Sequence, residues 1–136
     1  MDSPLFYTDV HFSSQFTHSL TDTGCSCYAT ISPAIVRRHK LPTFIISPRR
    51  VSGLFQNKQQ MITQVAYGLI DLGGHQQRCI FTYVVPNQSE NLILGQKWME
   101  DQDVVLSPRK GYLTIKSTGI HIWNNNLRNN VNVKHV

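Results

Sequence analysis

One carboxylate in this sequence stands where the residue types and their spacing favour chemistry. Asp22 lies in the stretch SLTDTGCSCYATIS (19–32), flanked by threonine on both sides and followed two positions later by Gly24. No other Asp or Glu occurs between Asp9 and Asp71. Glycine permits the backbone of a tight turn and lets another chain approach closely. The pattern therefore predicts a carboxylate held on a short turn at the end of a strand.

The simplest alternative is that Asp22 only caps its own loop. An Asp side chain commonly accepts a hydrogen bond from the backbone two residues further on, which is an Asx-turn. A bare Asp-Thr-Gly tripeptide does not separate this structural role from a catalytic one. The elements around the tripeptide have to decide between the two.

Other catalytic and metal-binding signatures are missing from the sequence. The six histidines are scattered over predicted strand ends, turns and the tail, and no serine stands in a Gly-x-Ser-x-Gly elbow. Neither a P-loop nor a Gly-x-Gly-x-x-Gly motif occurs. Cys25 and Cys27 lack the second ligand pair that a structural zinc site needs. We therefore predict that the protein uses no metal and no cofactor.

The three cysteines, Cys25, Cys27 and Cys79, form an odd set. This number favours reduced thiols over a disulfide framework. Alternation along an extended segment points Cys25 and Cys27 to the same face. We expect both to be small core residues, and redox control of the neighbouring loop is the open alternative.

Most of the chain has the composition of β-strands. Aromatic and β-branched residues are concentrated in short segments, which turn residues separate at regular intervals. Ser32 and Pro33 are typical of a helix start, so short helices are expected over 33–39 and 96–102. The segments predicted as strands are 5–12, 16–22, 27–31, 43–47, 49–55, 61–72, 77–85 and 92–95, with a hairpin over 104–115.

This order of elements predicts a mostly-β fold, either a small barrel or a sandwich. The length of 136 residues suits one domain with a substantial core. We place that domain at residues 1–122. Residues 123–136 are rich in asparagine and are expected to form a disordered tail.

The net charge of +5 raises the question of a nucleic-acid partner. The stretch 23–70 contains six Lys or Arg residues and no acid. However, the basic residues are dispersed along the chain and form no run interleaved with aromatic residues. We therefore expect a solvated basic surface, and nucleic acid is not the main partner that the sequence predicts.

The sequence gives no sign of a membrane or secretory destination. No window of about 18 apolar residues occurs. The first residues, Met1–Pro4, lack the basic and apolar regions of a signal peptide. The expected location is intracellular and cytoplasmic, without membrane contact.

The motifs taken in order resemble one family. A strand leads into Asp-Thr-Gly, a glycine-containing hairpin follows about thirty residues later, then a Gly-Gly hairpin at 73–74, and then LILG (92–95) ahead of a short helix. This order resembles the retropepsin-like aspartic proteases. The segment LILGQKWMEDQDVVLSPRKGYLTI (92–115) is similar to the protease domain of gypsy-type retrotransposons. The stretches LTDTGCSCYATIS (20–32), YVVPNQ (83–88) and LILGQKWMEDQDV (92–104) most resemble the elements of filamentous fungi. The resemblance covers about residues 5–120.

The resemblance implies a retropepsin-like closed β-barrel with one lobe per chain. It implies an aspartic endopeptidase that activates water with two carboxylates and processes a retrotransposon polyprotein. Two carboxylates a few Å apart share one proton, because both cannot be charged at once. The chain carries Asp-Thr-Gly once, at Asp22, and Asp71-Leu72-Gly73 lacks the hydroxyl and fits a turn. The second carboxylate would therefore come from another copy, which makes a homodimer with Asp22 at its two-fold axis.

The resemblance also assigns roles to the surrounding residues. Thr23 would hydrogen-bond across the dimer axis, and Gly24 would offer backbone groups to an extended peptide substrate. A hairpin over 51–60, with a polar turn at 55–60, would be a flap that closes over the peptide. The flap residues are Val51, Ser52, Gly53, Leu54, Phe55, Gln56 and Asn57. The residues that would support the Asp22 loop or wall a substrate pocket, with plain core as the alternative, are Leu92, Ile93, Leu94 and Gly95.

A non-catalytic protein of the same fold is the main alternative. The flap tip FQNKQ (55–59) departs from the glycine-rich tips of viral relatives. The chain could then be a dimerisation or binding module, or the remnant of a decayed element. The intact Asp-Thr-Gly favours the enzyme.

Overall fold

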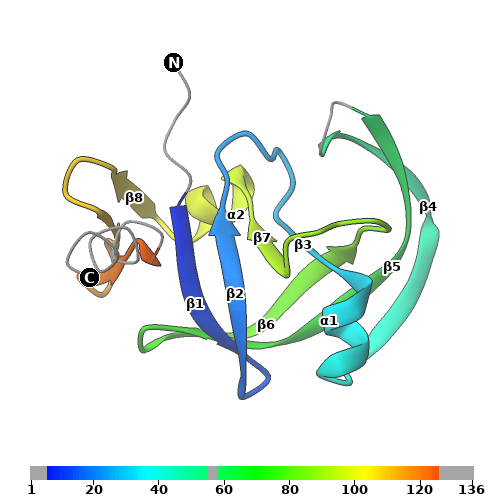
Figure 1. The fold of residues 1–136 in the computed structure, drawn as a ribbon, viewed down its shortest axis with the longest axis horizontal. Coiled ribbons are helices and arrows are strands. Elements are labelled where there is room, and N and C mark those ends of the chain that lie inside the picture. Colours follow the sequence, from blue (N-terminus) through cyan, green and yellow to red (C-terminus); the bar gives the residue numbers. More distant parts are fainter. Residues whose placement is uncertain (1–5, 55–57, 126–136) are drawn as a thin grey trace, which may run out of the picture.

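A computed structural model describes residues 6–54 and 58–125 of the chain (Figure 1). Within these ranges it contains ten strands and two short helices. In chain order they are β1 (Phe6–Phe12), β2 (Gln15–Thr21), β3 (Ala29–Ile31), α1 (Pro33–Arg38), β4 (Thr43–Leu54), β5 (Lys58–Leu72), β6 (His75–Val84), β7 (Leu92–Leu94), α2 (Gln96–Asp101), β8 (Val104–Ser107), β9 (Tyr112–Ile115) and β10 (Ile120–Trp123).

Six strands close into a barrel. Their order around it is β1, β2, β7, β3, β6 and β5, and the pairing of β1 with β5 completes the ring. This closure brings Phe12 opposite Ile70. Strand β4 pairs with β5 outside the ring and curves along one end of the molecule (Figure 1). The predicted mostly-β closed barrel with short helices is confirmed.

One large apolar core fills the barrel. Strand β1 alternates buried and exposed residues, so that Phe6, Val10 and Phe12 point inward. Trp98 of α2 is 1% exposed and belongs to the same cluster. Removing this apolar surface from water stabilises the framework on which the loops stand.

Helix α1 begins where the sequence predicts. The Ser32 Oγ accepts a hydrogen bond from the Ile35 N–H at 3.2 Å, and Pro33 occupies the first helical turn. Such a cap satisfies a backbone donor that the helix itself leaves free. The helix ends one residue earlier than expected, at Arg38, with His39 as its C-cap.

The two strands predicted at 43–47 and 49–55 are one strand, β4. Pro48 lies inside it, where the pairing with β5 shifts between Ile45 and Arg49. Proline lacks the N–H that a regular ladder needs, but an edge strand with a bulge tolerates it. The expected break is therefore an irregularity within a continuous strand. Lys58, predicted in the turn, already belongs to β5.

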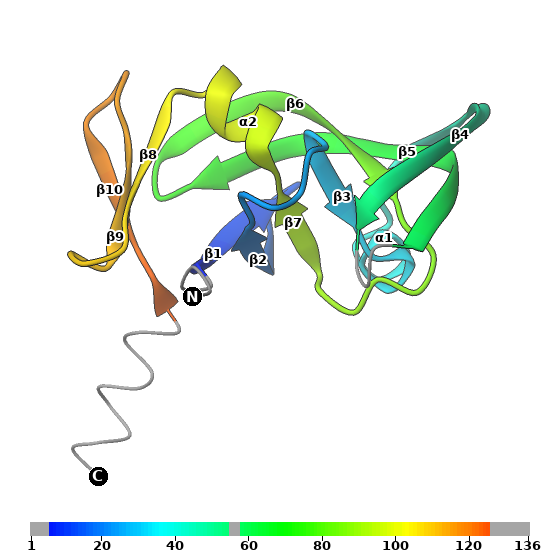
Figure 2. The same ribbon diagram turned by 90° about the horizontal axis from the view of Figure 1, so that it is seen from above.

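A second, small sheet follows the barrel in the order β10, β9, β8 (Figure 2). The predicted hairpin over 104–115 is present, and the Gly111 N–H closes its turn on the Ser107 carbonyl at 2.9 Å. Strand β10, over 120–123, was not predicted. It pairs with β9 and adds a third strand to the hairpin.

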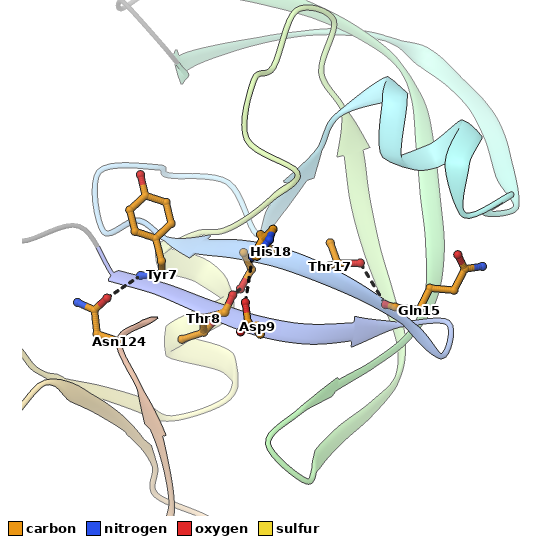
Figure 3. A network of polar contacts seen from close by, with 8 residues as sticks. Tyr7, Thr8, Asp9, Gln15, Thr17, His18 and Asn124 are labelled. Carbon is orange, nitrogen blue, oxygen red and sulfur yellow. Dashed lines mark hydrogen bonds and ion pairs between the residues drawn. The ribbon is translucent and has the colours of Figure 1, made fainter. Parts of the chain in front are cut away.

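Asn124 ties this second sheet to the barrel. Its backbone N–H donates to the Gly111 carbonyl at 2.8 Å. Its side-chain Oδ1 accepts a hydrogen bond from the Tyr7 N–H at 3.3 Å, as Figure 3 shows. Trp123 and Asn124, which the sequence assigned to the tail, thus belong to the folded part. Residues 126–136 lie outside the described ranges, and the division into domain and tail stays a prediction.

Among the described residues, no helix is long and apolar enough to cross a membrane.

Candidate active site

The loop between β2 and β3 carries Asp22. It starts where Thr21 of β2 pairs in parallel with Leu94 of β7. The Asp22 N–H then donates to the Leu94 carbonyl at 2.9 Å. The backbone of Asp22 is therefore fixed by a central strand of the barrel.

The Asp22 side chain folds back on its own loop. The side-chain Oδ1 accepts a hydrogen bond from the Gly24 N–H at 2.9 Å. The backbone carbonyl of Asp22 accepts one from the Cys25 N–H at 3.1 Å. This is the Asx-turn that a purely structural role requires. It also holds the carboxylate in one orientation, and Asp22 stays half-buried while Thr23 and Gly24 are exposed. The local bond is therefore compatible with both roles.

Backbone bonds from the start of α2 clamp the rest of the loop. The Gln96 N–H donates to the Cys25 carbonyl at 2.8 Å, and the Gly95 N–H donates to the Tyr28 carbonyl at 2.9 Å. A Cβ at Gly95 would collide with the Cys27 carbonyl oxygen and lie 2.9 Å from the Cys25 carbonyl oxygen. Only glycine lets the two segments approach this closely.

The three apolar residues before Gly95 divide between two clusters. Leu92 and Leu94 are fully buried in the main core. Ile93 points to the opposite side, where it joins a smaller cluster with Leu20 and Ile62. This smaller cluster lies between the Asp22 loop and the β4–β5 hairpin, since Val51 of β4 packs against it. Ile93 is thus the member of the trio that lies on the hairpin side.

Cys25 and Cys27 both belong to the smaller cluster, at 2% and 8% exposure. They are free thiols and share one face, as expected for small core residues. A hydrogen bond with Cys25 and, to a smaller extent, the charge of Lys97 lower the pKa of Cys27 to about 7, against the opposing effect of burial. The same contact raises the pKa of Cys25. Cys27 is therefore the thiol that loses its proton first.

The predicted flap corresponds to the end of the β4–β5 hairpin. Val51 pairs with Gln60, and Leu54 pairs with Lys58. Ser52, Gly53 and Leu54 lie in β4, whereas Phe55, Gln56 and Asn57 lie outside the described residues. In Figure 1 the hairpin and the Asp22 loop both rise at the upper side of the barrel.

A pocket of about 560 Å³ adjoins the loop. It begins at Ser26, four residues after Asp22, and extends to Arg50 and Val51 of the hairpin. Its remaining wall comes from β5, from β6 and from Lys97 of α2. The lining residues are Ser26, Cys27, Tyr28, Ala29, Arg50, Val51, Val65, Gln77, Cys79, Phe81, Tyr83 and Lys97.

The sequence alone did not single out this pocket. Alternation in QRCIFTYVV (77–85) was the usable signal, because Gln77, Cys79, Phe81 and Tyr83 share one face of a strand. The sequence could not predict that Arg50 and Lys97 line the same pocket, since the two lie 47 positions apart. Asp71, by contrast, is the turn residue that the sequence predicts: its Oδ1 accepts a hydrogen bond from the Gly74 N–H at 2.9 Å.

No group of three or more His, Cys, Asp or Glu residues in the described ranges could hold a metal ion.

Comparison with known proteins supports the fold. No protein-family description matches the chain, and no curated protein matches it. Among solved structures, the chain is similar to the retroviral protease-like domain of Ddi1 from Leishmania major. The TM-score is 0.62 at 14% sequence identity, over 88% of this chain and 92% of that domain. The chain therefore has the fold of a retroviral protease-like domain, with one Asp-Thr-Gly loop on its barrel.

Proposed function

We propose that this protein is an aspartic endopeptidase that acts as a homodimer. Each copy would supply one Asp22, and the two carboxylates would lie on the two-fold axis. One carboxylate takes a proton from the attacking water, and the other, which holds the shared proton, protonates the departing group. No metal or covalent intermediate takes part in this reaction.

The position of Asp22 is the observation that carries this proposal. Its carboxylate sits on a loop fixed by β7 and by the Gly95 contact, yet it is half-buried rather than enclosed. The next two residues, Thr23 and Gly24, are exposed in the single chain. A second copy can therefore approach the loop at these residues, with Thr23 bonding across the axis.

The hairpin and the Ile93 side supply the substrate surface in this proposal. An extended peptide would lie between the Asp22 loop and the β4–β5 hairpin, with its backbone bonded to both. Closing of the hairpin over 51–57 would exclude water from the reacting bond. Ile93 and Val51 share the cluster on this side, so they would support the surface from below.

A retroelement polyprotein is the substrate class that we propose. The support is the similarity of residues 92–115 to the protease domain of gypsy-type retrotransposons. In that setting the enzyme cuts its own precursor into separate proteins.

The direct test is cleavage of an apolar peptide by the purified full chain at mildly acidic pH. The matched control is Asp22→Asn, which keeps the size of the side chain and the acceptor for the Gly24 N–H. We expect turnover by the parent chain, inhibition by a statine-containing peptide, and a loss of at least about a thousandfold in the variant.

Oligomeric state has to be measured on the same samples by sedimentation. A dimer without turnover, in which the parent and Asp22→Asn behave alike, would reject the enzyme in favour of a non-catalytic module. A chain that stays monomeric at the assay concentration and still cleaves would reject the shared carboxylate pair.

A further inference from the structure

The pocket beside the Asp22 loop differs in chemistry from the apolar core beneath it. It lies on the outer face of β6, where Cys79 and Phe81 alternate with the buried Ile80 and Thr82. Val65 and Phe81 give it apolar walls. A hollow of about 560 Å³ with apolar walls has room for a side chain with an aliphatic stem and a polar end.

Two cations from different elements line this pocket. Lys97 reaches it from α2 and Arg50 from β4, and both side chains are exposed. A third cation touches the wall, since the Arg49 guanidinium donates to the Tyr83 hydroxyl at 3.2 Å. No Asp or Glu is among the lining residues. The one ion pair of the described residues, Asp9 with His18, involves none of these cations.

A hydrogen-bonded chain fixes the polar floor of the pocket. The buried Trp98 indole donates to the Gln77 side chain at 3.1 Å, and the Gln77 amide donates to the Tyr28 hydroxyl at 2.9 Å. The Tyr28 hydroxyl then donates to Asp101 at 2.6 Å. Burial and Asp101 raise the pKa of Tyr28 to about 12, so Tyr28 stays neutral. These bonds hold the floor in place; the Tyr28 hydroxyl adds no charge, and Asp101, the carboxylate it contacts, is not among the residues that line the pocket.

We propose that this pocket binds an acidic side chain, Glu or Asp, of the peptide substrate. Lys97 and Arg50 would pair with the carboxylate, and Val65 and Phe81 would pack against its stem. The proposal rests on the proposed endopeptidase function and specifies which substrates it prefers. Alternate side chains of an extended peptide point the same way, so one of them can enter the pocket while the scissile bond lies near Asp22.

A peptide substrate explains the arrangement better than a nucleic acid does. Binding of a phosphate backbone uses a track of cations along a surface. Here the cations flank one hollow next to the loop that carries Asp22. A single carboxylate between two cations is a charge-assisted contact with defined geometry.

The test uses matched peptides that differ at one position from Glu to Gln to Lys, scanned over each position flanking the cleaved bond. For the parent chain we expect one position at which Glu gives a kcat/KM about tenfold above Gln, with Lys lowest. Rising salt should shrink the difference, because the cations are exposed.

Charge reversal at the pocket should reverse this preference. In Lys97→Glu, and separately in Arg50→Glu, the Glu peptide should lose its advantage and the Lys peptide should gain. Lys110→Glu is the matched control, since it makes the same charge change in the exposed turn between β8 and β9. This control should keep the parent preference.

The outcomes separate the pocket from the enzyme. Cleavage without any difference between Glu, Gln and Lys peptides would overturn the pocket and leave the endopeptidase standing. If no peptide is cleaved, the endopeptidase fails, and binding of labelled peptides to Asp22→Asn by fluorescence anisotropy decides on the pocket alone. Tighter binding of the Glu peptide, lost in Asp22→Asn/Lys97→Glu, would support it, and equal binding of Glu and Lys peptides would overturn it.

Discussion

At the scale of single residues, the Asp22 loop depends on one glycine distant in sequence. Gly95 lies against the carbonyl groups of Cys25 and Cys27, which leaves no room for a side chain. The backbone bond from Gln96 to Cys25 needs this close approach. Asp22 itself is bonded to its neighbours in the loop, so its placement follows from how well that loop is held.

We therefore predict that Gly95→Ala destabilises the protein and displaces the loop. A Cβ that collides with backbone has no flexible neighbour to move aside, so we expect a loss of about 3 kcal/mol or more in the free energy of unfolding. Urea denaturation followed by tryptophan fluorescence measures it, because Trp98 is buried in the native state.

Gly119→Ala is the control for this variant. Gly119 has a φ of +75° but no atom within 4 Å of an added Cβ. Its substitution by alanine should lower the free energy of unfolding by only about 1 kcal/mol, because alanine is strained in the left-handed backbone conformation. Equal losses in the two variants would contradict the steric role of Gly95.

At the scale of elements, the sequence predicted the strands whose composition and turns are local. Ser32 with Pro33 marked α1, and Ser107–Gly111 marked the β8–β9 turn, since capping and turn chemistry depend on adjacent residues. Pro48 was taken as a break, but β5 holds β4 together across it. Strand β10 was missed although Ile120, Ile122 and Trp123 are typical strand residues, because its four residues directly precede the asparagine-rich tail and were not assigned to an element.

The candidate site divides in the same way. Asp22 was identifiable because the three residues of its motif are contiguous. The LILG segment (92–95) also follows it in the order that is typical of retropepsin-like proteases. The pocket was not identifiable, because Arg50, Gln77 and Lys97 meet only after three elements have packed. Spacing within a motif is written in the sequence, whereas contacts between elements depend on the whole barrel.

A pH effect follows from the end of helix α1. His39 is 7% exposed, and its burial, followed by the charge of Arg38, lowers its pKa below the usual 6.5. The unfolded chain therefore binds this proton more readily than the folded one. Stability should fall as the pH drops below about 6.5, and it should be regained at neutral pH.

His39→Gln tests this prediction by urea denaturation at pH 7.5 and pH 5.0. The variant cannot gain the proton, so it should lose less stability between the two values than the parent chain loses. His121→Gln is the control, because His121 is exposed in β10. A variant whose loss at pH 5.0 equals that of the parent would show that His39 does not cause the effect.

At the scale of the whole molecule, one chain supplies only half of the proposed active site. The described chain offers one carboxylate on an exposed loop, while the reaction needs two. Activity should therefore depend on pairing, and it should rise more steeply than linearly with protein concentration wherever the dimer dissociates.

Mixing provides the sharper prediction. An equal amount of Asp22→Asn, allowed to exchange subunits with the parent chain, should lower the measured cleavage rate to about half, because mixed dimers hold one carboxylate. Larger excesses should lower it further. The rate is followed with the same apolar peptide.

Serum albumin at the same mass is the control for crowding and adsorption. If Asp22→Asn leaves the rate of the parent chain unchanged after exchange has been verified by labelled subunits, each copy works alone.

The bond between Asn124 and the Tyr7 backbone has a consequence for engineering the chain (Figure 3). It brings residue 124 next to residue 7, across 117 positions of sequence. A short linker could join residue 124 to Phe6, which starts β1, and new termini could be opened at the exposed Gly73-Gly74 turn between β5 and β6. Such a circular permutant would keep every strand of the barrel, and its free ends would lie at the turn that adjoins Ile120 and Ile122 of β10.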